Sequence, residues 1–404
     1  MAHEECGLIG RDESTEDHLR EWCADLLTVA RAMDGAATPF IVFSLDRMKR
    51  NLALLRRCLP EARLHFPVKC LYVRALLHQV QEHVDALDVQ SEWEASLCDP
   101  SAPLSFHSPW LDERIFKRSN LAQVSVNSLH QAQRLIAADS TLKWGCRVAT
   151  SIGRQTDKQV RSKFGLNVDE LEQLWGFARR AGRQVSFLHH HGSSRLAEPS
   201  FANAMVRNFL ADIARTSFGT DIGELNLGGG IDGAYELHRR GVQLSNLLDA
   251  LVSPVRATLP DCQIVIEPGR FVTEDAGIAV VTVREVRPIG DVTDVVVDLS
   301  TGFLIPLPAA RFRFAVLGGA TVAPGLVRLV DGTCSDAGVI STQVIGTKVE
   351  VGSRIAVTNI GAYTTSCAGP FHSEMPELWI TTDGRAHCVL DAATQEGNCR
   401  ATLY

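Results

Sequence analysis

The sequence predicts an α/β fold with an added β part: a (β/α)8 barrel of the TIM type followed by a C-terminal all-β domain. Over residues 37–275, eight apolar strand-like segments alternate with segments that are mostly helical in pattern, and eight such alternations close a barrel. Beyond about residue 275 the apolar segments become short, β-branched and closely spaced, with Gly and Pro between them. A chain of 404 residues also exceeds one ordinary hydrophobic core, so two domains are expected.

The barrel elements follow one another at regular intervals along the chain. A helix is expected over residues 45–59, because Met48, Leu52, Leu55 and Leu59 share one helical face. An open doubly wound sheet is the alternative architecture, but no GxGxxG motif follows an early strand. The expected strands are Leu64–Val68, Val84–Val89, Pro103–Phe106, Gln123–Val126, Lys143–Val148, Gln184–His189, Glu224–Leu227 and Gln263–Ile266, and helices between them include Ser128–Ala138, Asp169–Ala181 and Leu244–Leu259.

Different structure is expected on each side of the barrel. Residues 1–36 are predicted to form an N-terminal helical extension, with one amphipathic helix over 17–33. The apolar strand 40–43 falls in the barrel part of the chain, but it can instead complete the β domain. Residues 276–404 are predicted to form that domain, with strands at Ala279–Val286, Val292–Asp298, Arg311–Val316, Gly325–Val330, Lys348–Val351, Arg354–Asn359 and Leu378–Thr382.

Composition excludes several classes of partner. The net charge of −7 argues against a nucleic-acid-binding surface. No apolar run reaches the roughly 18 residues that a membrane span requires, and the acidic start is not a signal peptide. The 11 cysteines include no CxxC pair, which favours reduced thiols in a cytoplasmic protein over disulfides or a zinc site. No metal, membrane or nucleic-acid partner is therefore expected.

Lys69 and Glu267 directly follow the first and the last barrel strands. Because these two strands are neighbours in a closed barrel, the side chains are expected to approach each other although they are distant in sequence. A partly desolvated lysine can form an imine with an aldehyde cofactor, and a carboxylate can keep a pyridine nitrogen protonated. Taken alone, Lys69 is more simply a lysine at the barrel rim that reaches water. Taken alone, Glu267 is more simply the partner of Arg270 in an ion pair.

Two further motifs follow the sixth and seventh strands. Gly228, Gly229 and Gly230 leave backbone N–H groups unshielded, which suits a phosphate nest, although a tight turn has the same composition. In His189–Ser193, one imidazole can stack on a cofactor ring and Ser193 can bind a phosphate. Three adjacent histidines can also indicate a metal, but neighbouring strand residues point to opposite faces and cannot all converge on one ion.

All four motifs lie at the carboxyl ends of strands, where the active site of a barrel is found. An amine, an imidazole, a phosphate nest and a carboxylate on one rim together predict a pyridoxal-phosphate (PLP) site.

The ordered set of motifs resembles the fold-type III PLP enzymes with an alanine-racemase-like barrel, and within them the ornithine/diaminopimelate/arginine decarboxylase family. The resemblance extends from about Thr38 to Phe371. It is carried by Pro67-Val-Lys69-Cys70, Ser162-Lys-Phe-Gly165, His190–Ser193, Gly228–Gly230, Glu267-Pro-Gly-Arg270, Gly332-Thr-Cys334 and Gly361-Ala-Tyr363-Thr364.

The resemblance implies a role for each matched residue. Lys69 would carry the cofactor as an aldimine, Glu267 would partner the pyridine nitrogen, and His190 would stack on the ring. Cys334 would reach the neighbouring subunit's site in a homodimer and reprotonate the quinonoid carbanion after CO2 leaves. The residues implied to hold the phosphate are Ser193, Gly229, Gly230, Arg270 and Tyr363, and those implied to line the cofactor are Asp88 and Arg147.

The chain departs from the family pattern mainly in the loop that selects the substrate. The acidic residue that often follows the cysteine is Ser335 here, Asp336 comes one place later, and a further common aspartate is Gly338. His191 replaces the usual valine of the histidine motif, and no arginine precedes Pro306, where diaminopimelate enzymes carry one. Asp298 keeps an aspartate where decarboxylases of basic amino acids often hold the distal ammonium.

The predicted function is PLP-dependent decarboxylation of a basic or ornithine-like amino acid, with Asp298, Ser335 and Asp336 as the substrate-binding residues. The altered loop leaves open a conjugated or carrier-bound amino acid of a specialised biosynthetic pathway. An amino-acid racemase or epimerase is disfavoured because such enzymes usually have a less acidic partner at the pyridine nitrogen than Glu267. A decarboxylase-like regulator without cofactor is disfavoured because Lys69, Glu267 and Cys334 are all present.

Overall fold

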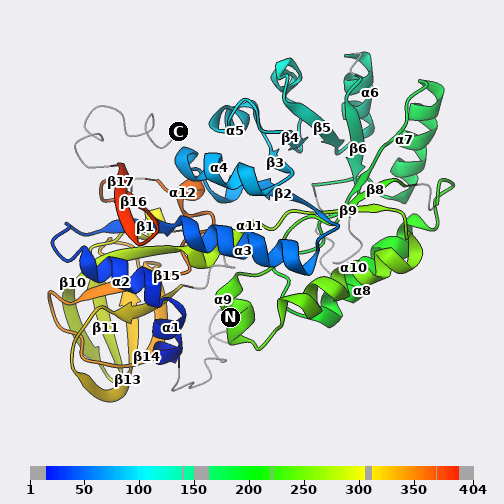
Figure 1. The fold of residues 1–404 in the computed structure, drawn as a ribbon. Coiled ribbons are helices and arrows are strands. Elements are labelled where there is room, and N and C mark those ends of the chain that lie inside the picture. The colour runs from blue at the N-terminus through cyan, green and yellow to red at the C-terminus, as the bar shows by residue number, and fades with distance from the viewer. Residues whose placement is uncertain are drawn as a thin grey trace. The chain divides into compact units, whose positions relative to one another are not determined.

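The computed structural model describes residues 15–138, 141–149, 163–219, 222–304, 312–369 and 371–390 (Figure 1). Residues 1–14 of the expected extension, the position before Pro306, Ser162 and Arg311 lie outside these ranges. Two compact units divide the chain. One runs from Arg47 to Thr273, and the other combines the chain up to Asp46 with the chain from Glu274 onward.

The unit from Arg47 to Thr273 contains a closed parallel barrel of eight strands in chain order, β2 to β9 (Figure 1). Closure is made by β2 and β9, which pair in parallel with Leu64 opposite Ile266. The predicted barrel is thereby confirmed. Its strands are β2 Arg63–Pro67, β3 Ala86–Val89, β4 Leu104–His107, β5 Leu121–Val126, β6 Lys143–Arg147, β7 Leu188–His189, β8 Glu224–Asn226 and β9 Gln263–Ile266.

Helices follow most of the barrel strands. In α7, Asn167 caps the helix by accepting from the Glu170 N–H, and the Glu170 carboxylate accepts from the Asn167 N–H, so both ends of the capping box are formed. The helices of the barrel part are α3 Leu45–Cys58, α4 Arg74–Val80, α5 Glu92–Leu97, α6 Leu129–Ala137, α7 Val168–Arg180, α8 Pro199–Ile213, α9 Ala234–Arg239, α10 Leu244–Thr258 and α11 Gly269–Thr273, with 3-10 turns η1 Val68–Cys70, η2 Gln81–His83 and η3 Glu113–Lys117.

The barrel strands alternate between buried apolar and buried polar side chains. In β4, for example, Leu104 and Phe106 alternate with Ser105 and His107, and all four are buried. Because successive strand side chains point to opposite faces, the apolar set packs outward on the helices and the polar set fills the interior. The buried polar residues on these strands are His65, Asp88, Ser105, His107, Gln123, Ser125, Arg147, His189, Glu224 and Asn226.

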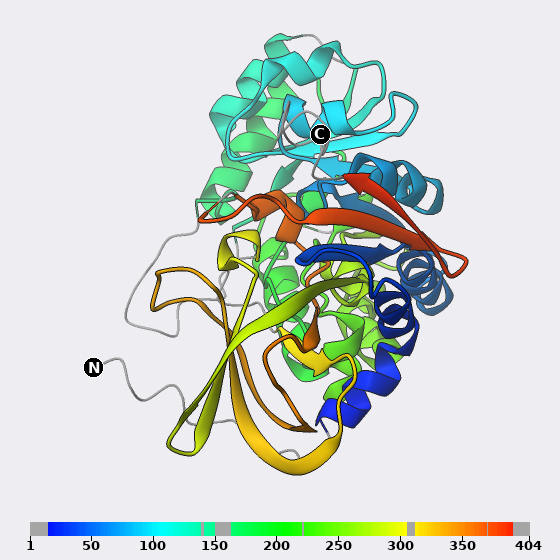
Figure 2. The same cartoon turned by 90° about the vertical axis from the view of Figure 1, so that its left-hand side faces the viewer.

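The second unit is built around one long strand. The first half of β10 pairs with β1 and β15, and after a register shift between Val283 and Glu285 its second half pairs with β11. Figure 2 shows the long bent strands of this unit from the side. The strands are β1 Phe40–Ser44, β10 Gly277–Ile289, β11 Val292–Val297, β12 Arg313–Val316, β13 Thr321–Val330, β14 Val339–Thr347, β15 Arg354–Thr358, β16 Glu377–Thr382 and β17 Arg385–Leu390. The remaining elements are helices α1 Thr15–Trp22, α2 Ala24–Ala32 and α12 Thr364–Cys367 and 3-10 turns η4 Glu274–Ala276 and η5 Thr301–Phe303.

The N-terminal strand β1 belongs to this second sheet. It pairs antiparallel with β10 and parallel with β16, and all five of its residues are buried. A strand with neighbours on both sides and both faces covered reads as a continuous apolar run, which explains the Phe-Ile-Val-Phe sequence.

Several expected elements differ in the structure. Of the predicted strand Gln184–His189 only β7 Leu188–His189 is a strand, and β14 and β17 are not among the predicted strands. The predicted strand Lys348–Val351 is wrong: β14 ends at Thr347, and the chain turns through Gly352, at φ +89°, with the Ser353 hydroxyl accepting from the Glu350 N–H. The single N-terminal helix is instead α1 and α2, which are separated at Cys23, where ψ is 15°. None of the helices within the described ranges has both the length and the hydropathy needed to cross a bilayer.

Candidate active site

Lys69 lies immediately beyond the carboxyl end of β2. The strand ends at Pro67, and the chain enters the 3-10 turn η1, which holds half-buried Lys69 between buried Val68 and Cys70. The segment after β9 packs on this turn, since a Cβ on Gly269 would lie 2.8 Å from Pro67 Cγ. The barrel therefore brings the chain near Lys69 and the chain near Glu267 together, as the sequence predicts.

Glu267 is buried at the end of β9 and is surrounded by donors. Asn226 Nδ2 donates to Glu267 Oε1 at 2.7 Å, and His189 Nε2 lies 3.3 Å from the same oxygen. Burial alone would raise the pKa of the Glu267 carboxyl, but His189, as a hydrogen-bond donor to the carboxylate, and the positive charge of Lys69 outweigh it and hold the pKa well below its usual range. Glu267 is consequently an ionised carboxylate in a water-poor site.

Asp88 and His107 form a second buried pair beside Glu267. Asp88 Oδ1 and His107 Nδ1 are 2.6 Å apart, at the ends of β3 and β4. Burial and then the charge of Glu267 raise the pKa of Asp88, and burial lowers the pKa of His107 to about 3. Both directions favour one shared proton on the Asp88 carboxyl and a neutral imidazole.

His190 stacks on Phe209 of α8, with ring centroids 4.3 Å apart and an interplanar angle of 23°. One face of the imidazole is therefore covered by the Phe209 ring. Burial lowers the pKa of His190 to about 3, so the ring is neutral near pH 7.

The glycine segment after β8 forms a tightly packed turn. Gly228 and Gly230 have φ of +72° and +90°, and a Cβ on Gly230 would collide with the Ser193 carbonyl oxygen. The Gly228 N–H donates to Asn226 Oδ1 at 2.8 Å, and the Gly229 N–H donates to His191 Nδ1 at 3.1 Å. Only glycine fits this segment, and in the protein itself the Gly228 and Gly229 amides are bonded to side-chain acceptors.

Ser193, Arg147 and Arg270 lie on the same side of the barrel. The Ser193 hydroxyl donates to the Arg195 carbonyl at 2.8 Å and accepts from the Arg195 N–H at 3.1 Å. Arg147 ends β6, with its guanidinium carbon 5.2 Å from the centroid of the Phe164 ring. Arg270 is buried in α11. The two arginines place positive charge at the strand ends near the glycine turn.

The remaining predicted residues belong to the unit that contains β10 to β17. Cys334, Ser335 and Asp336 are exposed in the loop between β13 and β14, and Tyr363 caps α12 at φ +66°. The Asp298 carboxylate accepts from the Thr282 N–H at 2.8 Å and is paired with Arg284 at 2.7 Å. Asp298 is thus partly neutralised by the chain's own residues.

Asp331 closes the loop that carries Cys334. Its carboxylate accepts from the backbone and hydroxyl of Thr301 at 2.9 and 2.6 Å, and from those of Thr333 at 3.1 and 2.8 Å. A Cβ on Gly338 would collide with Asp331 Oδ1, which explains the glycine at that position.

Several buried polar atoms at the barrel strand ends are suited to a bound polar group. Among the residues that the structure describes, Asp88 Oδ2 and both His190 ring nitrogens make no hydrogen bond. Buried polar atoms normally have partners, and such exceptions mark ligand sites. A planar ring against His190, a ring nitrogen at Glu267, an aldehyde at Lys69 and an anion at the glycine turn fit these residues, so the donor set matches PLP.

His107, His189 and Asn226 were not recognised from sequence as site residues. His107, His189 and Glu267 place one potential metal-ligand atom each within 4.8 Å of one another. Each of His107, His189 and Asn226 is the last residue of a barrel strand, which is the feature of the sequence that could have identified them. Their contacts with one another and with Glu267, however, form only when the barrel closes.

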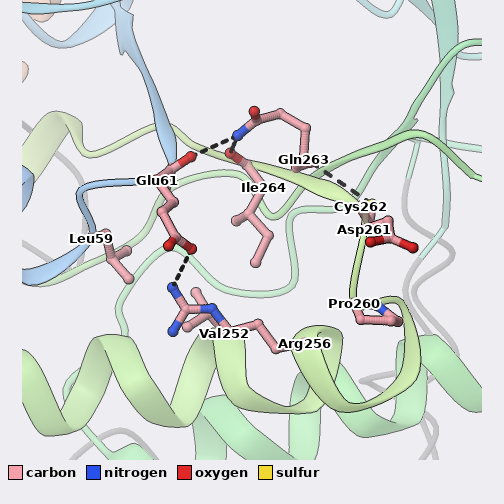
Figure 3. A pocket seen from close by; sticks show the side chains of 10 residues that line it. Leu59, Glu61, Val252, Arg256, Pro260, Asp261, Cys262, Gln263 and Ile264 are labelled. Carbon is pink, nitrogen blue, oxygen red and sulfur yellow. Dashed lines mark hydrogen bonds and ion pairs between the residues drawn. The ribbon is translucent and has the colours of Figure 1, made fainter.

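A separate pocket of about 350 Å³ lies at the opposite ends of the strands (Figure 3). Glu61 precedes β2, and Arg256 of α10 points toward it at 3.6 Å. Gln263, at the start of β9, donates to the Glu61 carbonyl at 2.9 Å. Because barrel enzymes carry catalysis at the carboxyl ends of strands, this pocket is not the candidate active site.

Comparisons with known proteins identify the family of the chain. The family model "Pyridoxal-dependent decarboxylase, pyridoxal binding domain" matches residues 45–274, more than half of the chain. The chain is 23% identical to the lysine/ornithine decarboxylase of Selenomonas ruminantium, over 83% of this chain and 87% of that protein. It is 26% identical to the diaminopimelate decarboxylase of Actinosynnema pretiosum, over 89% and 87%.

The fold is also shared with solved structures. The arginine decarboxylase of Paramecium bursaria Chlorella virus, solved with agmatine, superposes with a TM-score of 0.75 at 18% identity, over 90% of this chain and 100% of that chain. These likenesses define a PLP enzyme with a fold-type III barrel and a β domain. The chain belongs to the pyridoxal-dependent decarboxylase family and is a PLP-dependent amino-acid decarboxylase.

The buried histidines predict acid lability. Burial lowers the pKa of His65 and His189 to about 4, and that of His107 and His190 to about 3. As pH falls below about 6.5, the unfolded chain binds protons that these folded residues reject, so stability present above pH 6.5 is lost toward pH 4. Each histidine contributes up to about 1.4 kcal/mol per pH unit.

Thermal unfolding followed by circular dichroism from pH 7 to 5 checks this prediction. His65→Asn should weaken the pH dependence, whereas the exposed control His130→Gln should leave it unchanged. An unfolding midpoint that stays constant over this range would contradict the prediction.

Proposed function

We propose that the enzyme decarboxylates an amino acid with a distal cationic group, of the lysine, ornithine, arginine or diaminopimelate type. The supporting observation is the group of Lys69, Asp88, His190 and Glu267 at the carboxyl ends of the barrel strands. The relatives support the substrate class, because their names specify lysine, ornithine, diaminopimelate or arginine. Asp298, Ser335 and Asp336 are our candidates for the residues that recognise the distal group.

Each barrel residue has a proposed task. Lys69 holds the cofactor covalently, His190 covers one ring face, and ionised Glu267 holds a proton at the pyridine nitrogen. Bound PLP supplies the electron sink for the pair released when CO2 departs. The phosphate is assigned to Ser193, Gly229, Gly230, Arg270 and Tyr363, and the walls of the cofactor site to Asp88 and Arg147.

Protonation of the product carbon is assigned to Cys334 Sγ. The thiol lies exposed in the β13–β14 loop, where a second copy of the chain can approach it. We therefore propose a homodimer in which this loop serves the neighbouring subunit, as the family resemblance implies.

A CO2-release assay on the PLP-loaded enzyme tests the substrate class. We expect release from at least one of ornithine, lysine, arginine and diaminopimelate, and none from glutamate. Asp298→Asn should raise KM for that substrate by roughly 10- to 100-fold, since hydrogen bonds to charged groups contribute about 1.5–3 kcal/mol. Asp294→Asn, a nearby aspartate paired with Arg328 on β13, is the matched control. Release only from a conjugated or carrier-bound amino acid would refute the proposed substrate class.

Replacement of Lys69 tests the attachment of the cofactor. Lys69→Ala should lose the visible absorption band of covalently held PLP and decarboxylase activity, because no other amine is assigned to the aldehyde. The exposed Lys117→Ala should keep both. A persistent band in Lys69→Ala would assign the attachment to another residue.

Replacement of Cys334 tests the proton donor and the dimer together. Cys334→Ala should keep PLP binding and slow turnover by roughly 10²- to 10⁴-fold, the usual contribution of a positioned acid. Exposed Cys367→Ala is the control. Mixing Lys69→Ala with Cys334→Ala subunits should restore activity if each site uses both chains, whereas full activity of Cys334→Ala alone would remove the thiol from the mechanism.

A further inference from the structure

Two imidazoles join two carboxylates in one buried cluster at the strand ends. Asp88, His107, His189 and Glu267 come from β3, β4, β7 and the end of β9, and each is at most 4% exposed. His107 contacts Asp88 at 2.6 Å, and His189 lies 3.3 Å from Glu267. The two histidine rings meet edge to face, with centroids 4.8 Å apart. The four side chains therefore form a continuous path between the carboxyl groups.

The two carboxyl groups of this cluster favour opposite protonation states. The pKa of Asp88 is raised by burial and by the charge of Glu267, whereas the pKa of Glu267 is held low by the groups around it despite burial. Two carboxylates that influence each other in a low-dielectric site cannot both ionise at low cost. The favoured state therefore has the proton on Asp88 and the negative charge on Glu267.

We propose that His107 and His189 are positioning residues that keep the shared proton on the Asp88 carboxyl and leave Glu267 ionised for the pyridine nitrogen. The inference rests on the role of Glu267 in the proposed function and adds two residues to it. His107 Nδ1 accepts the hydrogen bond of the Asp88 carboxylic acid. His189 presents its Nε2–H to Glu267 Oε1 as a second donor beside Asn226.

Neutral imidazoles suit this task better than cations or apolar rings. Burial keeps both histidines neutral near pH 7, since it lowers the pKa of His107 to about 3 and that of His189 to about 4. A neutral ring offers one donor and one acceptor, which matches one carboxylate and one carboxylic acid. The other charged and titratable groups that face the cluster include Lys69 on η1, Arg147 on β6, His65 on β2, Glu94 on α5, and His190 and His191 after β7.

Infrared difference spectroscopy locates the proton directly. The holoenzyme at neutral pH should show the carbonyl stretch of one buried carboxylic acid, which Asp88→Asn removes and Glu267→Gln retains. The same band should appear in Lys69→Ala, which lacks the covalent cofactor. The proton assignment is thereby tested even if the proposed role of Lys69 fails.

Substitution of His189 tests the donor to Glu267. His189→Phe should add a second carboxylic-acid band, change the absorption spectrum of bound PLP, and lower kcat more than it changes KM. The ionised fraction of Glu267 falls tenfold for each unit that its pKa rises above the assay pH. His189→Gln keeps an N–H donor and should restore the wild-type infrared and absorption spectra and most of kcat. A purely structural role would give no such rescue.

Other results would overturn the inference. They are the absence of any carboxylic-acid band, its loss in Glu267→Gln but not in Asp88→Asn, or an unchanged spectrum in well-folded His189→Phe. His107→Phe, with circular dichroism as the folding check, should shift the Asp88 band because its acceptor is lost, and an unshifted band would remove His107 from the proposal. Stoichiometric Zn²⁺ binding that disappears in His107→Phe would assign the cluster to a metal instead.

Discussion

The pairing of β2 with β9 is the interaction on which the active site depends. These are the first and last strands of the barrel, and their register places Leu64 opposite Ile266. Lys69 and Glu267 follow within a few residues of that pair, so an error in register would separate the amine from the carboxylate. The short parallel ladder is thus a structural requirement and also the means by which distant parts of the chain become one site.

The polar interior of the barrel has an energetic cost that its hydrogen bonds offset. Barrel interiors are usually filled with branched apolar side chains, but here Gln123 donates to Ser105 at 3.2 Å, and Lys143 and Arg63 neutralise buried Glu224. Apolar stabilisation comes instead from the outward faces of the strands, where residues such as Phe66, Phe106 and Trp144 are buried. Because the apolar side chains lie on the outward faces of the strands, the barrel interior can hold ionisable groups without loss of the hydrophobic core.

The sequence was sufficient to predict the barrel, and it also indicated candidate residues at the strand ends. Lys69, His190 and Glu267 could be recognised because each follows a strand whose pattern is local. His107 and His189 could not be recognised in this way, because their partners lie on other strands and the contacts form only when the barrel closes. The turn at Lys348–Val351 was misread because alternating β-branched residues favour a strand, whereas Gly352 and the following Ser353 impose a turn. The roles of the site residues remain predictions for the experiments described.

The contact between Asp331 and Gly338 limits how the loop between β13 and β14 can evolve. A side chain at position 338 would collide with a carboxylate that four hydrogen bonds hold in place. An aspartate at position 338 would therefore collide with Asp331 as the loop is built here. A lineage would have to lose the Asp331 carboxylate first and pass through an intermediate with a loosened loop. The two positions should accordingly change together among close homologues.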